Sequence, residues 1–371
     1  MLVGTSTSAH QVEGNNKSSD WWHFEQTNRL KHKSGSGCDQ YRLYKKDIDL
    51  MKSLGYNAYR FSIEFARVMP HERSIDQGAV KHYKDMIEYM KQKDIEPIPT
   101  LWHYTLPLWF LRKGGFEKRK NFKYFFDYVN ALLEAGLDVR YILTINEPVI
   151  FSTAAYLSGL YPPFVRSFIK WNRVMLNLFA LHNEVYDILK SYGYRVSFAN
   201  NFVDMKSDLI FSPVTKLIDY LMNQRPLLFT RFDFIAINYY HSIDAIRYLV
   251  YKIYKGRKRV EFLDAKGLYN IIRREYSLFK KPIMITENGL DTLDDDFRCR
   301  FIKDHFESVL SARRSGVPVL GYLHWSFIDN FEWTYGYNKN FGVVGFDMKT
   351  KRRIPKKSAY VLGELARENR G

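Results

Sequence analysis

The sequence has little cysteine and no long apolar run. Its 371 residues include two cysteines, Cys38 and Cys299, which lie far apart and show neither a CxxC nor a metal-ligand spacing. We therefore predict free thiols in a reducing compartment. No run of 18 apolar residues is present, so no transmembrane helix is expected. The first residues, MLVGTSTSAH, show neither the basic region nor the apolar core of a signal peptide, and a cytoplasmic protein is expected.

Motifs of three common protein classes are also missing. The histidines form no HxH or HExxH pattern, which leaves a metal-dependent hydrolase without support, and neither a metal nor another cofactor is expected. No GxGxxG turn follows a predicted strand, as it would in a dinucleotide-binding sheet. No fold motif of nucleic-acid-binding proteins accompanies the basic residues.

Positive charge is in excess. The chain has 56 Lys and Arg against 40 Asp and Glu, a formal net charge of +16, which favours anions as partners. Basic and aromatic residues alternate between Arg247 and Phe262. A nucleic-acid or membrane surface could bind such a stretch, but a solvated loop or helix face is the commoner meaning. We expect neither nucleic acid nor membrane as a partner, and the role of residues 255–259 stays open.

Short apolar runs rich in β-formers recur eight times along the chain. They begin at Leu2, Ala58, Glu96, Arg140, Arg195, Asp233, Lys281 and Val319. Amphipathic stretches lie between them, such as residues 41–56 with an apolar stripe at helical spacing. This alternation predicts an α/β fold, a single (β/α)8 barrel over residues 1–371. A doubly wound sheet is the rival, and no linker rich in Gly, Ser or Pro divides the chain.

Polar residues occur where most of these predicted strands end. They are Arg60, His103, Asn146, Glu147, Asn238, Tyr240, Glu287 and Trp325. Catalytic groups of such barrels gather at the carboxyl ends of the strands. Structural polar residues would not all fall at one end, so this pattern predicts an active site there.

Glu147 and Glu287 suggest the reaction. They end the fourth and seventh predicted strands, which should lie on opposite sides of the barrel. Two facing carboxyl groups fit the cleavage of a glycosidic bond, one protonated to release the leaving oxygen and one ionised to attack the anomeric carbon. A gap of about 5–5.5 Å would mean retention of configuration and a wider gap inversion. The sequence separation does not supply that distance.

Neighbouring residues separate the two roles. We expect Arg60 and Tyr240 to hold Glu287 ionised as the nucleophile. Glu147 precedes Pro148 and lies away from Arg60, so it is better placed to stay protonated and act first as acid and then as base.

Seven motifs occur in the order known from one family. They are TSTSAHQVEG, AYRFSIEFARVMP, LWHYTLP, TINEP, INYY, ITENG and HWSFIDNFEWTYGY. With them the chain, from its start to about Tyr360, resembles glycoside hydrolase family 1, the retaining β-glycosidases with a TIM barrel. One of these motifs alone would be weak, but the ordered set is specific.

The resemblance implies a role for each site residue. Glu147 is implied as acid/base and Glu287 as nucleophile, with Arg60 and Tyr240 beside it. Further implied contacts are Gln11 with hydroxyls of the bound sugar, His103 with the 3-hydroxyl, Asn146 with the 2-hydroxyl, Asn238 near the site, Trp325 as stacking floor, and Glu332 and Trp333 with the 4- and 6-hydroxyls. The implied activity is hydrolysis of terminal β-glycosides, with glucose and galactose favoured and fucose as a further candidate. Small β-glycosides or oligosaccharides are the expected partners, and an oligomer is compatible with the sequence.

Departures from the family pattern leave alternatives open. Relatives that cleave 6-phosphorylated sugars lack the glutamate that corresponds to Glu332; here Glu332 should repel a phosphate, although Lys339 stands where such enzymes have a lysine. The segment between Glu147 and Asn238 is shorter than in typical relatives, so the leaving-group side should be open. A non-catalytic barrel that binds sugars or anions is the remaining alternative, supported only by the net charge.

Overall fold

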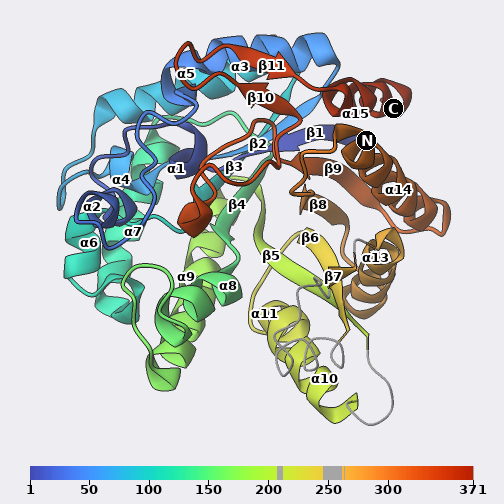
Figure 1. Cartoon of the computed structure of the whole chain (residues 1–371). Coiled ribbons are helices and arrows are strands. Elements are labelled where there is room, and N and C mark those ends of the chain that lie inside the picture. The colour runs from blue at the N-terminus through green and yellow to red at the C-terminus, as the bar shows by residue number, and fades with distance from the viewer. Residues whose placement is uncertain (207–211, 245–260, 263, 371) are drawn as a thin grey trace.

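The computed structural model describes residues 1–206, 212–244, 261–262 and 264–370. The basic stretch 255–259 lies outside the described residues. In this structure eight parallel strands close into a barrel with helices around it (Figure 1). The barrel strands are β1 (Leu2–Ser6), β2 (Ala58–Ser62), β3 (Glu96–Trp102), β4 (Tyr141–Asn146), β5 (Arg195–Lys206), β6 (Ile235–Asp244), β8 (Ile283–Asn288) and β9 (Val319–Trp325). The predicted (β/α)8 barrel is therefore confirmed.

Closure follows from the strand order β5-β4-β3-β2-β1-β9-β8-β6, because β5 also pairs with β6. Two strands, β5 and β6, separate β4 from β8 on one side of the ring, and four strands separate them on the other. The predicted opposite placement of these two strands thus holds approximately. Three short strands were not predicted: β7 (Glu261–Phe262) pairs antiparallel with β6, and β10 (Val344–Phe346) pairs antiparallel with β11 (Arg353–Pro355).

Helices follow the strands and cover the outside of the barrel (Figure 1). The α-helices are α1 (Ala9–Val12), α2 (Asp20–Gln26), α3 (Gln40–Leu54), α4 (Phe65–Val68), α5 (Gln77–Gln92), α6 (Leu108–Arg112), α7 (Phe122–Glu134), α8 (Pro148–Ser152), α9 (Phe168–Ser191), α10 (Ser212–Asp219), α11 (Arg225–Leu228), α13 (Ala265–Phe279), α14 (Asp295–Arg314) and α15 (Lys357–Glu368). Short 3-10 helices are η1 (Gly115–Glu117), η2 (Arg119–Asn121) and η5 (Trp333–Tyr335), and π-helical turns are η3 (Thr153–Leu157) and η4 (Tyr220–Gln224).

The apolar stripe predicted between residues 41 and 56 belongs to α3. Ile48, Met51 and Leu54 are buried, because their spacing places them on the face that packs against the barrel. Gly55 ends this helix with φ 99°, a left-handed conformation that glycine adopts without steric cost.

Buried apolar side chains form two groups. The larger lies between the sheet and the helices, and a smaller one fills the barrel interior, with Ala58, Ile98 and Met284 among its members. Side chains alternate across a strand, so Arg60 shares the inward face of β2 with Ala58. This alternation puts a guanidinium inside the barrel, above the apolar plug.

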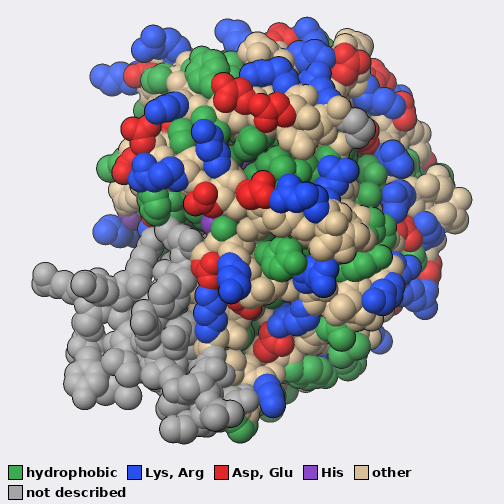
Figure 2. All heavy atoms as spheres, turned by 90° about the vertical axis from the view of Figure 1, so that its right-hand side faces the viewer, with side chains coloured by type: hydrophobic (Ala, Val, Ile, Leu, Met, Phe, Trp, Pro, Cys, Tyr) green, Lys and Arg blue, Asp and Glu red, His purple; other side chains and the backbone are tan. Residues whose placement is uncertain are grey.

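The two ends of the described chain lie together beside β1 and α15 (Figure 1). The amino group of Met1 donates to the carbonyl oxygen of Asn369 at 3.0 Å. None of the helices described is both long and apolar enough to cross a membrane. On the face drawn in Figure 2, Lys and Arg side chains are spread among acidic and apolar ones over the described part of the surface.

Candidate active site

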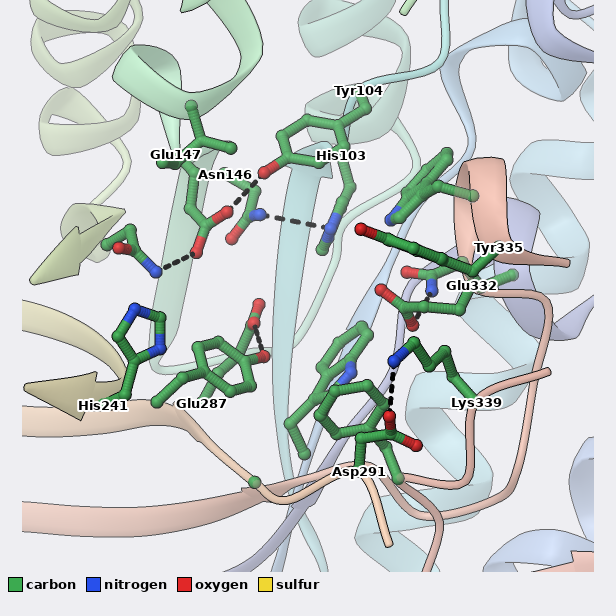
Figure 3. Close-up of a pocket in the computed structure, with 18 of the residues that line it drawn as sticks. His103, Tyr104, Asn146, Glu147, His241, Glu287, Asp291, Glu332, Tyr335 and Lys339 are labelled. Atoms are coloured by element: carbon green, nitrogen blue, oxygen red, sulfur yellow. Dashed lines mark hydrogen bonds and ion pairs between the residues drawn. The ribbon is translucent and has the colours of Figure 1, made fainter. Parts of the chain in front are cut away.

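A cavity of about 440 Å³ opens at the carboxyl ends of the barrel strands (Figure 3). Its volume falls within the range of small-molecule sites. All predicted site residues line it except Arg60 and Asn238, which lie behind its wall. The lining members of that set are Gln11, His103, Asn146, Glu147, Tyr240, Glu287, Trp325, Glu332 and Trp333. Among the residues described, no three His, Cys, Asp or Glu side chains group so as to hold a metal ion.

Glu287 is held by one cation and one phenol. Its Oε1 accepts from the Arg60 guanidinium, and its Oε2 accepts from the Tyr240 hydroxyl at 2.5 Å. A shift of register in β8 lets two consecutive residues reach inward: Thr286 donates to Asn238 at 2.7 Å while Glu287 meets Arg60. Without this bulge, strict alternation would turn one of the two outward.

Burial sets the protonation of Glu287. With 3% of its surface exposed, burial raises the pKa of Glu287 to about 7, with the Arg60 cation opposing this and the Glu147 carboxylate adding to it. Arg60 and Tyr240 both favour the ionised form, as expected from the sequence, but burial opposes them and leaves Glu287 partly protonated near neutral pH. The two partners were inferred from the sequence, but the cost of removing the carboxylate from water was not weighed against them.

Glu147 stands at the start of α8 in a left-handed conformation, with φ 45° and ψ 63°. Such backbone is rare outside glycine and tends to occur at functional sites. The carboxylate accepts from Asn238 Nδ2 at 2.9 Å and Asn201 Nδ2 at 3.3 Å on Oε1, and from the Tyr104 hydroxyl on Oε2. Figure 3 shows the carboxylates of Glu147 and Glu287 turned toward each other across the cavity.

Asn146 ties the two halves of the site together. Its Oδ1 accepts from Arg60 at 2.7 Å and from Asn238 at 3.1 Å. Its Nδ2 therefore faces His103 Nε2, 3.1 Å away, which must accept. Burial and the nearby Arg60 lower the pKa of His103 well below its usual range, so the ring is neutral and carries its proton on Nδ1.

The opposite end of the cavity combines Gln11 of α1 and Trp325 of β9 with residues of the loop that follows β9. Gln11 Nε2 donates to Glu332 Oε2 at 2.9 Å and to Asn330 Oδ1 at 3.0 Å. Burial raises the pKa of Glu332 to about 8, with Gln11 opposing. The rings of Trp325 and Trp333 each stack on His103, with centroids 5.9 and 6.1 Å away. This end presents aromatic faces beside hydrogen-bonding groups, which suits a sugar ring.

Sequence reasoning missed several polar residues of the cavity lining, among them Tyr104, Asn201 and Asp291. Tyr104 follows His103 within the LWHYTLP motif, and Asn201 follows the core of β5, so the strand-end rule applied elsewhere would have found both. Asp291 comes after β8 and forms an ion pair with Lys339, with 2.5 Å between Oδ2 and Nζ (Figure 3). No signal in the sequence links Asp291 to Lys339, because 48 residues separate them.

Comparison with known proteins identifies the family. The model of glycosyl hydrolase family 1 matches residues 1–213 and 256–371. The chain belongs to glycosyl hydrolase family 1. It is accordingly a glycoside hydrolase of the β-glucosidase and β-galactosidase type. Two of the proposed site residues, Asn238 and Tyr240, lie in the unmatched stretch, so their assignment depends on their contacts with Glu147 and Glu287.

Individual relatives of this family 1 chain are similar over almost their whole lengths. β-Glucosidase A of Thermotoga maritima is 26% identical, over 99% of this chain and 97% of the relative. A 6-phospho-β-galactosidase of Clostridium acetobutylicum is 25% identical, over 100% and 96%. Among solved structures, a β-glycosidase from Pyrococcus horikoshii has a TM-score of 0.92 at 36% identity, covering 99% of this chain and 93% of that one.

Proposed function

We propose that this family 1 hydrolase is a retaining exo-β-glycosidase that releases terminal β-D-glucose or β-D-galactose, with β-D-fucose as a further sugar. The observation that carries the proposal is the pair Glu147 and Glu287, which face one cavity with different partners. Glu287 contacts a cation, whereas the contacts of Glu147 are uncharged amides and a phenol.

The reaction would proceed in two displacements. Glu287 attacks the anomeric carbon as the bond to the leaving oxygen breaks, and the electron pair of that bond stays with the leaving oxygen, which takes a proton from Glu147. Glu147 then removes a proton from water, whose oxygen displaces Glu287 from the anomeric carbon. Configuration is inverted twice and so retained.

The raised pKa of Glu287 would suit an acid as well, so the roles need a physical reason. Both oxygens of Glu287 accept hydrogen bonds, one of them from a guanidinium that can only donate. Protonating Oε1 would oppose the guanidinium, and protonating Oε2 would require the Tyr240 phenol to accept instead of donate. Attack by an oxygen lone pair requires ionisation alone, which above pH 7 is the prevailing state of this group.

Sugar recognition would use the residues at the other end of the cavity. We infer that Gln11, His103 and Asn146 bind ring hydroxyls, Trp325 stacks under the ring, and Glu332 and Trp333 hold the 4- and 6-hydroxyls. Gln11 and Glu332 are already paired, which preorganises donor and acceptor before a sugar arrives.

Hydrolysis of 6-phosphorylated glycosides is the second candidate, favoured by the similarity to the Clostridium enzyme and by Lys339 in the cavity wall. Asp291 already neutralises Lys339, which weakens its attraction for a phosphate. Repulsion by Glu332 is smaller than the sequence indicated, because its pKa of about 8 leaves the group protonated at neutral pH. The paired lysine is thus the stronger argument for an unphosphorylated sugar.

The test compares Glu287→Ala and Glu147→Ala with the unaltered protein on nitrophenyl β-glucoside, β-galactoside, β-fucoside and 6-phospho-β-glucoside. Sodium azide is then added to each variant. We expect the α-glycosyl azide from Glu287→Ala and the β-glycosyl azide from Glu147→Ala, because azide replaces a nucleophile in one and attacks the glycosyl-enzyme in the other.

Exchanged azide products would reverse the two roles. Turnover of the phosphorylated substrate alone would establish the second candidate. A folded, unaltered protein that cleaves none of the four would refute the hydrolase proposal and favour a sugar-binding barrel.

A further inference from the structure

Tyr104 is a buried phenol that touches the carboxylate of Glu147. It follows β3 with φ 72°, a left-handed backbone that directs its ring across the cavity wall. Its hydroxyl donates to Glu147 Oε2 (Figure 3). The ring packs against Trp333, Tyr161 and Phe151, with centroids 5.2, 5.9 and 6.0 Å away. Packing on several sides fixes where the hydroxyl lies.

A chain of hydrogen bonds determines which oxygen of Glu147 can carry a proton. Arg60 can only donate, so the atom of Asn146 that faces it is the carbonyl oxygen. That oxygen also faces Asn238, which must present its amide nitrogen there. The same nitrogen lies 2.9 Å from Glu147 Oε1, and Asn201 adds a second amide at 3.3 Å. Oε1 therefore faces donors only and accepts from them.

The proton of Glu147 then belongs on Oε2, the oxygen beside Tyr104. We propose that Tyr104 is a positioning residue for this proton: its oxygen accepts from Oε2–H while Glu147 carries the proton, and its hydroxyl donates to Oε2 after the proton has left. This proposal rests on the proposed function, in which Glu147 is the acid. In the step itself the Oε2–H bond breaks, the leaving oxygen gains the proton, and the glycosidic bond breaks with its electron pair on that oxygen.

Tyr104 is suited to this exchange because it stays a neutral phenol. Burial, followed by the Glu147 carboxylate, raises the pKa of Tyr104 well above its usual range. The other titratable or charged groups that face this pair come from several elements. They are Tyr161 after η3, Tyr240 and His241 on β6, Glu287 on β8, Glu332 after β9, and Arg60 and His103 by way of Asn146.

The experiment uses Tyr104→Phe, which removes the hydroxyl and keeps the ring, with Tyr156→Phe as its control. Tyr156 is also buried, on η3 and outside the cavity, and loses the same atom. For each protein kcat/KM is measured against pH on phenyl and on 2,4-dinitrophenyl β-glucoside. The first substrate needs a proton on its leaving oxygen and the second does not, because dinitrophenolate is a stable anion.

We expect Tyr104→Phe to lose about tenfold in kcat/KM on the phenyl glucoside and less than about twofold on the dinitrophenyl glucoside. The alkaline limb of its pH profile should move to higher pH by up to about one unit, because a donor to the ionised carboxylate is gone. Tyr156→Phe should change neither. In a Glu147→Gln background, the added Tyr104→Phe change should have no effect on either substrate, because no acid is left to position.

Equal losses on both substrates, or an unmoved alkaline limb, would overturn the role of Tyr104 while leaving the proposed function in place. A loss that persists in the Glu147→Gln background would do the same, since it would show that Tyr104 acts on folding or sugar binding. An unaltered enzyme that cleaves neither substrate would instead overturn the proposed function, and this inference with it.

Discussion

Arg60 offers the sharpest test of how this site is held together, because its side chain joins three strands. The guanidinium donates to Thr100 on β3 at 3.0 Å, to Asn146 on β4 at 2.7 Å, and on β8 to Glu287 and to the Thr286 carbonyl at 3.3 Å. The change Arg60→Lys keeps the charge but replaces a planar fork with one ammonium on a flexible stem. Lysine cannot reach three strands from one position.

The magnitude follows from the bonds lost. A hydrogen bond that involves a charged group contributes about 1.5–3 kcal/mol net. Lysine keeps one or two of the four, so at least two are lost, and we expect the free energy of unfolding to fall by about 3–6 kcal/mol at pH 8. The lysine ammonium should contact Glu287 less closely than the guanidinium does and so oppose the effect of burial less. The pKa of Glu287 should therefore also rise above about 7.

The sign of the pH effect distinguishes this account from general damage. Glu287 has a folded-state pKa raised from 4.5 to about 7, so the folded state keeps a proton that the unfolded chain releases, and stability falls as pH rises between those values. In Arg60→Lys the folded-state pKa of Glu287 lies above 7, so the variant continues to lose stability at pH values where the unaltered protein no longer does. The difference in free energy of unfolding between the two proteins should therefore grow from pH 5 to pH 8, by about 1.4 kcal/mol for each unit of added pKa shift.

The assay is urea unfolding at pH 5 and pH 8, together with kcat/KM against pH. We expect the acid limb of the unaltered enzyme near the Glu287 pKa of about 7 and expect it to move upward in Arg60→Lys. The value of kcat/KM should fall by about a hundredfold or more, as when one preorganised charge contact is removed. Arg353→Lys is the matched control. Arg353 donates to both oxygens of Asp47 at 2.6 and 2.7 Å and to two carbonyls, all outside the cavity. It should lose stability and leave the acid limb unmoved. An Arg60→Lys enzyme with unchanged stability and acid limb would refute the reasoning.

Two further predictions test the electrostatics and the packing of the site. Glu332→Gln should become more stable relative to the unaltered protein as pH rises from 5 to 8, because the Glu332 pKa, raised from 4.5 to about 8, costs stability in that window. Because Glu332 is partly exposed in the cavity, we expect this gain in relative stability to be about 1–2 kcal/mol. A difference in thermal unfolding temperature between the two proteins that stays constant from pH 5 to pH 8 would contradict the prediction. Gly289→Ala would place Cβ 1.9 Å from the Trp325 carbonyl oxygen, which should cost about 1–3 kcal/mol in urea unfolding and lower kcat/KM. Gly345→Ala, whose Cβ meets nothing closer than 3.6 Å, should be near neutral, and equal losses in both variants would count against a local clash.

Much of the fold and most of the site could be predicted from the sequence, because both follow local patterns. Period-two apolar runs alternating with helical stripes determined the eight strands and their order. The rule that barrel strands carry functional groups at their carboxyl ends located Arg60, His103, Asn146 and both glutamates. Helix ends were predicted to within two residues where the stripe was clear: α3 covers Gln40–Leu54, against the expected stretch 41–56.

Tertiary structure alone decided how these residues meet. The bulge in β8 turns both Thr286 and Glu287 inward, and a bulge depends on the register of the neighbouring strands. Asp291 pairs with Lys339, and Tyr104 with Glu147, across 48 and 43 residues of sequence, a separation that local patterns do not span. The pKa of Glu287 depends on how much water the surrounding loops exclude as well as on Arg60. The residue types available for chemistry were thus determined by the sequence, while their protonation and partners were decided by burial and by contacts between distant strands.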